Sequence, residues 1–422
     1  MKAVIMAGGK GSRIATVKND IPKPMIPIAG KPVLEYEIES LVRSGITEII
    51  IVVGHLGSVI VDYFSDGSQL GATISYYSED TPLGTAGALY YLKDKLTEPF
   101  FLLNGDIMLD IDFIRMMRYH RDKNATVTLF THPNSHPFDS ALIFTDSLGR
   151  VTKWLHKEDE RSIYKNRVNA GIHILSPDIL NLFDGAFVDL DRDILKPLVS
   201  YGHVYAYDSP EYVKDMGTPE RLKRVEEDVL AGKVRGRNLK NRQKAIFLDR
   251  DGTLNKYKGF ITKPQDIELI DGVAEAIRRV NDSDYLTIVV TNQPVIARGE
   301  CTIDELNDIN ATLETELGKH GAYIDGLFYC PHHPDRGFEG ERPEYKVECD
   351  CRKPKPGLLF KAAEIFNIDL TASYMVGDSM TDVMAGMNAG CQAILIDNAM
   401  ESTKENESYE SLLEFVREII PS

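Results

Sequence analysis

Short, continuously apolar runs alternate with amphipathic segments along most of the chain, and this alternation constrains the fold more than any other feature. Residues 48–53 and 100–104 are apolar runs typical of strands that are buried on both faces. Residues 32–43 carry apolar side chains at helical spacing and stop before Gly45. The repeated order of strand, helix and strand predicts an α/β fold with a mostly parallel, Rossmann-like sheet covered by helices.

The alternation breaks near residue 230 and starts again after residue 243. Residues 231–244 hold six Lys or Arg among Gly, Asn and Gln, which is typical of an exposed connector. With 422 residues the chain is also too long for one core. We therefore predict domains at residues 1–231 and 244–422, joined by a basic linker at 232–243. Strands are expected in the second domain at 244–248, 285–290, 327–329, 373–376 and 393–396, and helices at 271–281, 302–320 and 357–366.

Composition and charge limit the classes of binding partner that the chain can have. The net charge of −16 argues against nucleic acid as the main partner. No apolar run approaches the roughly 18 residues of a membrane span, and the first residues form a strand pattern rather than a signal peptide. Three of the five cysteines fall between Cys330 and Cys351, which indicates metal ligands in a reducing, cytoplasmic setting. The oligomeric state stays open, a homo-oligomer included.

The first strand runs into a glycine-rich loop of residues 8–13. Glycines let backbone N–H groups close on a phosphate chain, and Arg13 adds a bidentate donor. The loop is not a P-loop, because Lys10 is followed by Gly11. It is not a dinucleotide fingerprint either, because Ile14 stands where a third glycine is needed. A plain tight turn remains the alternative for this loop alone.

Three charged residues strengthen the case for phosphate chemistry. Lys23 lies between Pro22 and Pro24, which stiffen its backbone. Asp106 follows the strand at 100–104, at the edge where open α/β sheets bind ligands. With Asp215 it gives two carboxylates, the usual protein share of a Mg²⁺ site that also binds substrate phosphates.

Five motifs in this order resemble the sugar-1-phosphate nucleotidyltransferases over roughly residues 1–230. They are Ala7-Gly8-Gly9-Lys10-Gly11-Ser12-Arg13 with Ile21-Pro22-Lys23-Pro24-Met25, Gly84-Thr85-Ala86-Gly87-Ala88-Leu89, Asn104-Gly105-Asp106, Val168-Asn169-Ala170-Gly171-Ile172 and Asp215-Met216-Gly217-Thr218-Pro219. The resemblance implies a mixed-sheet fold and in-line attack of a sugar 1-phosphate on the α-phosphorus of a nucleoside triphosphate. It implies that Gly8, Gly9 and Gly11 cradle the nucleotide phosphates and that Arg13 and Lys23 neutralise their charge. Gly84 would line the nucleoside pocket, and Asn169 and Gly171 would line the sugar pocket. Lys157 would bind the sugar phosphate, and Asp106 and Asp215 would hold Mg²⁺.

In the second domain, Asp249 and Asp251 follow the strand at 244–248. One such carboxylate can attack phosphorus while the other protonates the leaving oxygen. The alternative is that the two aspartates belong to a calcium-binding loop or to a turn. Thr291, Lys353 and Asp378 stand in three further motifs, at Val289-Val290-Thr291-Asn292-Gln293, Arg352-Lys353-Pro354-Lys355-Pro356-Gly357 and Val376-Gly377-Asp378-Ser379-Met380-Thr381-Asp382.

These four motifs resemble those of the haloacid dehalogenase phosphatases, with a Rossmann-like fold of their own. The resemblance implies that Asp249 is the nucleophile and Asp251 the general acid and base. Thr291 and Lys353 would bind the phosphoryl group, and Asn292 and Arg352 the rest of the substrate. Mg²⁺ would be held by Asp249, by the backbone of Asp251 and by Asp378, with Asp382 either in support or simply an acid at a helix start.

A second metal site is predicted from thiols. Cys330, His332, Cys349 and Cys351 make a closed tetrahedral Zn²⁺ set, which is typical of a structural role. His333 is the alternative imidazole. A nucleic-acid zinc finger is the rival interpretation, but the chain lacks the basic surface for it.

The sequence Cys330-Pro331-His332-His333-Pro334 with Cys351-Arg352-Lys353-Pro354 resembles the heptose-bisphosphate branch of these phosphatases, a cousin of the histidinol-phosphate branch. Removing a 7-phosphate from heptose 1,7-bisphosphate leaves a sugar 1-phosphate, which the first domain would activate. Residues 20–25 and 30–32 also resemble heptose 1-phosphate guanylyltransferases. We therefore predict consecutive steps toward GDP-heptose. The alternatives are a hexose-1-phosphate nucleotidyltransferase fused to a histidinol-phosphate-like phosphatase, and a non-catalytic sugar-nucleotide sensor.

Overall fold

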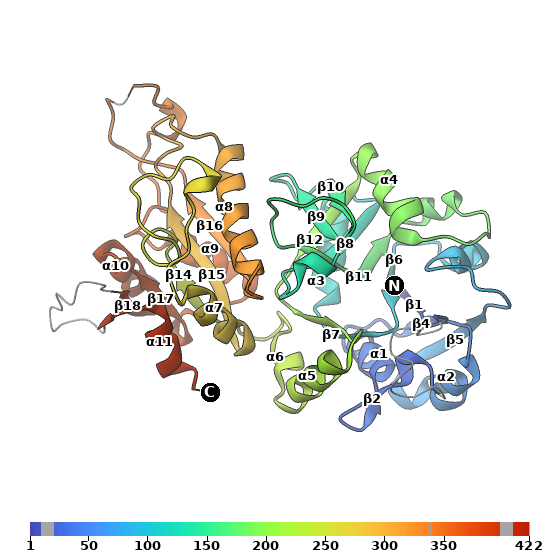
Figure 1. Ribbon diagram of the computed structural model, residues 1–422. Coiled ribbons are helices and arrows are strands. Elements are labelled where there is room, and N and C mark those ends of the chain that lie inside the picture. Colours follow the sequence, from blue (N-terminus) through green and yellow to red (C-terminus); the bar gives the residue numbers. More distant parts are fainter. Residues whose placement is uncertain (10–20, 338, 397–407, 422) are drawn as a thin grey trace. The chain divides into compact units, whose positions relative to one another are not determined.

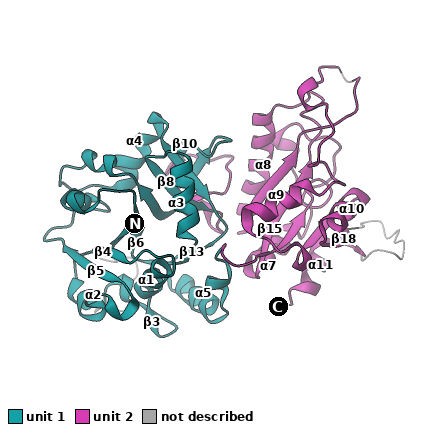
Figure 2. Ribbon diagram, turned by 180° about the vertical axis from the view of Figure 1, so that it is seen from behind, with its two compact units in different colours: residues 1–132, 143–154, 169–238 teal, residues 133–142, 155–168, 239–422 magenta. Residues whose placement is uncertain are grey.

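A computed structural model describes residues 1–9, 21–337, 339–396 and 408–421. The chain divides into two compact units, coloured separately in Figure 2. Unit 1 comprises residues 1–132, 143–154 and 169–238, and unit 2 comprises residues 133–142, 155–168 and 239–422. Each unit is built on its own sheet with helices around it, so the predicted α/β class is confirmed. No helix among the described residues is long and apolar enough to cross a membrane.

The large sheet of unit 1 is mixed (Figure 1). At its centre, β1 (Lys2–Met6) runs parallel to β4 (Glu48–Val53) and to β6 (Phe100–Asn104). On the far side of β6, β11 (Val168–Leu175) runs antiparallel. The order among the described strands is β10-β9-β11-β6-β1-β4-β5, with β8 on β11 and β12 on β8. The remaining strands are β5 (Thr73–Ser78), β8 (Val127–His132), β9 (Leu142–Thr145), β10 (Val151–Leu155) and β12 (Val204–Asp208).

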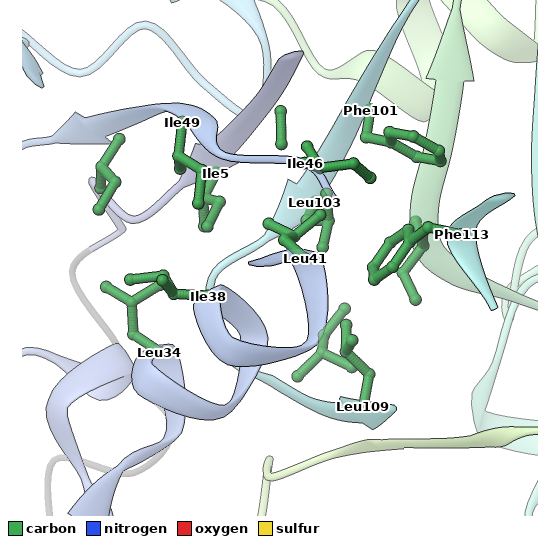
Figure 3. Packing of buried hydrophobic residues seen from close by; sticks show 14 of the residues in the cluster. Ile5, Leu34, Ile38, Leu41, Ile46, Ile49, Phe101, Leu103, Leu109 and Phe113 are labelled. Atoms are coloured by element: carbon green, nitrogen blue, oxygen red, sulfur yellow. The ribbon is translucent and has the colours of Figure 1, made fainter. Parts of the chain in front are cut away.

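Helix α1 (Val33–Arg43) shows how the sequence pattern becomes packing. Leu34, Ile38 and Leu41 are spaced by four and three residues and are fully buried. Figure 3 shows them facing Ile5 and Leu103 from the central strands. The helix ends at Ser44, and Gly45 follows with a φ of +75°, which glycine adopts without strain. The helix therefore covers the sheet from the position that the sequence predicted for it.

Unit 1 also has a two-stranded sheet, which contains Asp215 and begins directly after Asp106. In it, β7 (Ile107–Asp110) pairs antiparallel with β13 (Tyr212–Asp215). The other helices of unit 1 are η1 (Lys23–Met25), α2 (Gly57–Phe64), η2 (Ser68–Leu70), η3 (Gly87–Lys95), α3 (Phe113–Asp122), η5 (Pro177–Leu182), η6 (Leu190–Leu195), α4 (Lys196–Leu198), η7 (Val199–Tyr201), α5 (Pro219–Leu230) and α6 (Lys233–Gly236), and a short pair of strands is β2 (Pro27–Ile28) and β3 (Lys31–Pro32).

The prediction of an exposed connector is wrong for the middle of the basic segment. Lys233, Arg237 and Asn238 are at most 8% exposed. Asn238 Nδ2 donates to the buried Asp110 Oδ1 at 2.7 Å. The segment is basic and rich in small residues, yet Asn238 pairs with a buried partner in unit 1 rather than with water.

Unit 2 has a parallel sheet in the order β16-β15-β14-β17-β18-β19. Alternate residues of β14 enter two different apolar clusters, one with Ile246 and Leu248 and the other with Ala245 and Phe247. Helices therefore cover both faces. The strands of this sheet are β14 (Lys244–Leu248), β15 (Tyr285–Asn292), β16 (Gly326–Cys330), β17 (Tyr374–Gly377), β18 (Gln392–Ile396) and β19 (Ser408–Tyr409). The described helices of unit 2 are η4 (Pro137–Asp139), η8 (Pro264–Asp266), α7 (Val273–Asp282), α8 (Ile303–Gly318), η9 (Pro343–Tyr345), α9 (Gly357–Phe366), η10 (Leu370–Ala372), α10 (Met380–Ala389) and α11 (Leu412–Ile419).

Two short segments from earlier in the chain belong to unit 2. The segment 155–168 lies on α8 through a buried ion pair between Arg167 Nη1 and Glu314 Oε2 at 3.1 Å. Both side chains are less than 5% exposed. Backbone N–H groups of Tyr164 and Asn166 donate to Thr315 and Glu314. A buried pair satisfied in this way tolerates the loss of one partner poorly, because the other charge then stays buried alone.

We predict that N238L lowers the free energy of unfolding of unit 1 by about 1–3 kcal/mol, because the buried Asp110 carboxylate loses a donor. The matched control is R235A, three residues earlier in α6, where the Arg235 side chain is 69% exposed; it should change stability by less than about 0.5 kcal/mol. Denaturant unfolding of both variants measures the difference. Equally small changes in the free energy of unfolding for both variants would favour the prediction that residues 232–243 form an exposed connector.

Candidate active sites

Lys23 and Asp106 of the first predicted site pair where β6 turns into β7, and Asp215 lies on the strand beside β7. Asp106 follows Gly105 in this turn, and the Lys23 ammonium forms an ion pair with its carboxylate. In the antiparallel pairing of β13 with β7, Asp215 lies directly opposite Ile107, the residue after Asp106. Arg221 Nη1 donates to both oxygens of Asp215 at 2.7 and 2.8 Å. The structure thus brings two acids and a lysine to one sheet edge, which suits a divalent cation with phosphate ligands.

The described part of the glycine loop, Gly8 and Gly9, follows β1 at the same end of the sheet. A Cβ on Gly8 would lie 2.7 Å from Glu79 Oε2, so the Glu79 carboxylate lies directly against the loop. Glu79 is a residue that the sequence did not single out. Its Oε1 is buried without a hydrogen-bond partner among the described residues. Burial raises the pKa of Glu79, although the Leu83 N–H lowers it in part. Gly11 and Arg13 lie outside the described residues.

Gly84 joins the nucleoside loop to a distant segment. It has a φ of +81°, and a Cβ there would lie 2.2 Å from Val188 O. The Thr85 N–H donates to that same carbonyl at 2.9 Å. Only glycine fits, so the loop at 84–85 and the segment at 188–190 are held together.

The predicted sugar residues lie on β11. A Cβ on Gly171 would lie 2.4 Å from Asn104 Nδ2, which places Gly171 against the end of β6, two residues before Asp106. Asn169 Oδ1 accepts a hydrogen bond from Gly171 N at 3.3 Å. Lys157 is an exposed residue of segment 155–168, which belongs to unit 2, and its role stays a prediction. Trp154 is 3% exposed, which favours packing over sugar stacking.

Glu37 is a second acid that the sequence did not reveal. It is fully buried on α1, and its Oε1 accepts a hydrogen bond from Ile107 N at 3.1 Å, beside Asp106. Burial raises the pKa of Glu37 well above its ordinary value; the Ile107 N–H lowers it, and Asp106 raises it further. Glu37 therefore anchors the turn that carries Asp106 through its hydrogen bond with Ile107. Its helical position faces the core, where sequence reasoning expects an apolar residue.

In unit 2, three carboxylates converge at the carboxyl ends of β14 and β17. One oxygen each of Asp249, Asp378 and Asp382 lies within 4.8 Å of the others. A Cβ on Gly252 would collide with the Asp378 carboxylate, at 1.9 Å from its Oδ2, so the close approach needs the glycine. Burial, together with the charges of the neighbouring carboxylates, raises the pKa of Asp249 to about 6 and that of Asp378 to about 7. This donor set fits a hard divalent cation.

Lys353 is the buried cation of this cluster. Its Nζ lies 2.8 Å from Asp249 Oδ1 and 2.6 Å from Asp382 Oδ1, and it donates to Val290 O at 2.8 Å. Burial would lower its pKa, but the two carboxylates raise it overall. Asn292 fixes the backbone of Lys353 through two hydrogen bonds of 3.0 Å. Thr291, on the adjacent strand end, accepts from Gln293 Nε2 at 3.0 Å.

The Asp251 carboxylate accepts hydrogen bonds from three side chains. Arg250, which is fully buried, donates to both of its oxygens at 3.1 and 2.8 Å. Asn255 and Gln293 donate as well, at 3.0 and 2.8 Å. Burial would raise the pKa of Asp251, but the Arg250 guanidinium and these hydrogen bonds lower it overall. Arg250, Asn255 and Gln293 were not predicted as site residues, although all three lie within four residues of a predicted one.

The predicted zinc residues also come together. Cys351 Sγ lies 3.2 Å from both Cys330 Sγ and Cys349 Sγ, and 3.3 Å from His332 Nδ1. His333 points elsewhere, because its Nδ1 accepts from Asp335 N at 3.2 Å. Three thiols and one imidazole in this geometry fit Zn²⁺. Arg352 Nη1 donates to His332 O at 3.2 Å, which ties the thiol cluster to the loop that delivers Lys353.

The fold and the sites define a two-part enzyme: an α/β unit for nucleotidyl transfer and an aspartate-based phosphatase unit. A family model described as nucleotidyl transferase matches residues 2–232, and one described as HAD-hydrolase-like matches residues 350–418. A D-glycero-beta-D-manno-heptose-1,7-bisphosphate 7-phosphatase from Haemophilus ducreyi is 39% identical over 173 residues, which are 40% of this chain and 92% of that protein. The chain belongs to the nucleotidyl transferase family through its first part and to the family of these phosphatases through its second.

Two further similarities are of the same kind. The phosphatase of the same description from Pasteurella multocida is 44% identical over 147 residues, 35% of this chain and 77% of that protein. The crystal structure of HddC from Yersinia pseudotuberculosis complexed with GMP-PN is 26% identical, with a TM-score of 0.47, and the match covers 54% of this chain and 99% of that one.

The raised pKa of Glu37 predicts a pH-dependent effect of E37Q. The pKa of such a buried acid is higher in the folded protein than in the unfolded protein. At pH values below the unfolded pKa the acid does not lower the free energy of unfolding, and as pH rises above that pKa it lowers the free energy of unfolding increasingly. Glutamine has no such effect, so E37Q should gain stability relative to the parent protein between pH 5 and pH 8, by up to about 1.4 kcal/mol per pH unit. Denaturant unfolding in metal-free buffer at both pH values measures this.

The matched control is E98Q, at an exposed position of unit 1, which should follow the parent protein at both pH values. A stability difference for E37Q that does not change with pH would mean that Glu37 is ionised in the folded protein.

Proposed function

We propose that unit 2 removes the 7-phosphate of D-glycero-D-manno-heptose 1,7-bisphosphate and that unit 1 transfers a nucleotidyl group to the heptose 1-phosphate that results. One observation carries the proposal: a single chain joins a unit whose relatives are named heptose-1,7-bisphosphate 7-phosphatases to a nucleotidyl transferase unit. The product of the first reaction is a sugar 1-phosphate, the acceptor class of the second. The products would be phosphate, pyrophosphate and a nucleotide-activated heptose.

In unit 2, Asp249 attacks the phosphorus, and its Oδ–P bond forms as the bond to the sugar oxygen breaks. Asp251 gives a proton to that oxygen and later takes one from the water that hydrolyses the aspartyl-phosphate. The anionic phosphoryl group raises the pKa of Asp251 on binding and so opposes the effect of Arg250. Lys353 and Thr291 bind the phosphoryl oxygens, and Asn292 and Arg352 bind the rest of the substrate.

The cation of unit 2 would be Mg²⁺, held by Asp249, Asp378 and the backbone of Asp251. When bound it neutralises charge on the transferred phosphoryl group. Asp382 supports this site by pairing with Lys353.

In unit 1, an oxygen of the sugar 1-phosphate attacks the α-phosphorus of a nucleoside triphosphate, and pyrophosphate leaves. Gly8, Gly9 and Gly11 cradle the phosphate chain, and Arg13 and Lys23 neutralise it. Asp106 and Asp215 would hold Mg²⁺, which when bound supplies further neutralisation. Gly84 lines the nucleoside pocket, and Asn169 and Gly171 line the sugar pocket.

Glu79 supports GTP as the nucleotide donor. Its carboxylate lies against Gly8, and one oxygen has no hydrogen-bond partner among the described residues. The N1–H and 2-amino groups of guanine are two adjacent donors that a single carboxylate can accept. Adenine lacks the 2-amino group and presents an unprotonated N1 instead. An acid at this place therefore favours guanine, and the activated product would be GDP-heptose.

We predict that the purified protein converts heptose 1,7-bisphosphate, GTP and Mg²⁺ into phosphate, pyrophosphate and GDP-heptose. D249N should lower phosphate release by at least about a thousandfold, because the nucleophile is lost, while nucleotidyl transfer to added heptose 1-phosphate stays within twofold. Enzyme-coupled phosphate and pyrophosphate assays follow the two reactions separately. Phosphate release without any nucleotide sugar would overturn the linked function, and the loss of both activities in folded D249N would overturn the separate sites.

We infer that Cys330, His332, Cys349 and Cys351 hold a structural Zn²⁺. C349S should remove most of about one bound zinc per chain and lower phosphatase activity at least tenfold, because the loop that delivers Lys353 loses its anchor. C301S is the matched control, since Cys301 is a buried thiol outside the cluster, and it should retain zinc. Metal content by atomic emission decides the question, and full zinc occupancy in C349S would contradict this assignment.

A further inference from the structure

A carboxylate with few partners lies next to the predicted sugar residues of unit 1. Asp191 stands in the first turn of η6 and is half-buried. Its two oxygens accept only long hydrogen bonds from Asn169 Nδ2, at 3.4 and 3.3 Å. An ionised carboxylate offers about four acceptor positions. Among the described residues, most of the acceptor capacity of Asp191 is therefore unused.

The segment that carries Asp191 is attached to the nucleoside loop. Val188 N donates to Leu83 O at 3.0 Å, and Leu190 N donates to Thr85 Oγ1 at 2.7 Å. Gly84 makes the close approach to Val188 described above. Asp191 follows directly, so its backbone lies next to this loop, and its carboxylate contacts Asn169.

The amide of Asn169 cannot turn to satisfy Asp191 better. Its Oδ1 accepts from Gly171 N at 3.3 Å and lies 3.2 Å from His173 Nε2. Burial lowers the pKa of His173 to about 4, so the ring is neutral near pH 7 and donates from Nε2. The amide is thereby fixed with its NH₂ group toward Asp191.

We propose that Asp191 accepts hydrogen bonds from hydroxyl groups of the sugar 1-phosphate and helps to determine which sugar unit 1 accepts. The proposal rests on the proposed nucleotidyl transfer to a sugar 1-phosphate. Sugar hydroxyls are donors that fit unused carboxylate acceptors, whereas a phosphate group would be repelled. Asp191 therefore faces the hydroxyl end of the sugar. Asn169 and His173 act as a fixed support that sets its position.

The test uses D191N and D191A, with D178N as a matched control at an exposed aspartate in the first turn of η5. KM and kcat are measured for heptose 1-phosphate and for analogues that each lack one hydroxyl. D191N should raise KM for heptose 1-phosphate roughly tenfold or more, and D191A at least as much. KM for GTP and the thermal unfolding of unit 1 should stay unchanged, and D178N should behave as the parent protein.

The analogue series separates sugar binding from a structural role. The analogue that lacks the hydroxyl bound by Asp191 should already show a raised KM with the parent protein, and D191N should add little to it. An equal loss on every analogue, or no loss on any, overturns the proposal. Failure of the proposed function looks different, because the parent protein would then release no pyrophosphate with any of the sugar 1-phosphates.

Discussion

Both sites depend on a lysine ammonium held against carboxylates at the end of a buried strand. In unit 2, Lys353 lies between Asp249 and Asp382 with almost no exposure to solvent. Without this cation three acids could not share so small a space in ionised form, because each raises the pKa of the next. In unit 1, Lys23 pairs with Asp106 in the same way. Phosphoryl chemistry needs fixed positive charge beside a metal site, and in both units the fold supplies it from a proline-flanked segment.

Glycines make the second shared contribution. Gly252 admits the Asp378 carboxylate, Gly84 admits the carbonyl of Val188, and Gly171 admits the amide of Asn104. Each of these glycines has a positive φ, so the backbone conformation and the close contact both exclude a side chain. The polar groups can therefore come closer to one another than Cβ atoms would permit.

Much of this was predictable because the chemistry follows strand ends in local motifs. Asp249, Asp378 and Asp106 come directly after apolar runs, and parallel topology brings such residues to one edge. What failed depended on contacts distant in sequence. The burial of Asn238 follows from its partner Asp110, more than a hundred residues away. Glu79 and Glu37 stand in unremarkable local sequence, and only the fold places them beside Gly8 and Ile107. His332 and His333 are neighbours that no spacing rule separates, and loop geometry turns only the first toward the thiols.

The two units differ in how their acids are satisfied. In unit 2 the carboxylates of Asp249, Asp251 and Asp382 already have cationic partners in Lys353 and Arg250, so a substrate has to displace or share existing interactions. In unit 1, Glu79 and Asp191 keep acceptor oxygens that the described residues do not fill. Such oxygens are costly to bury unless a ligand brings donors. A guanine edge and a sugar hydroxyl are donors of the required kind. Our proposals for Glu79 and Asp191 thus attribute the specificity of unit 1 to acceptors that a nucleotide and a sugar together complete.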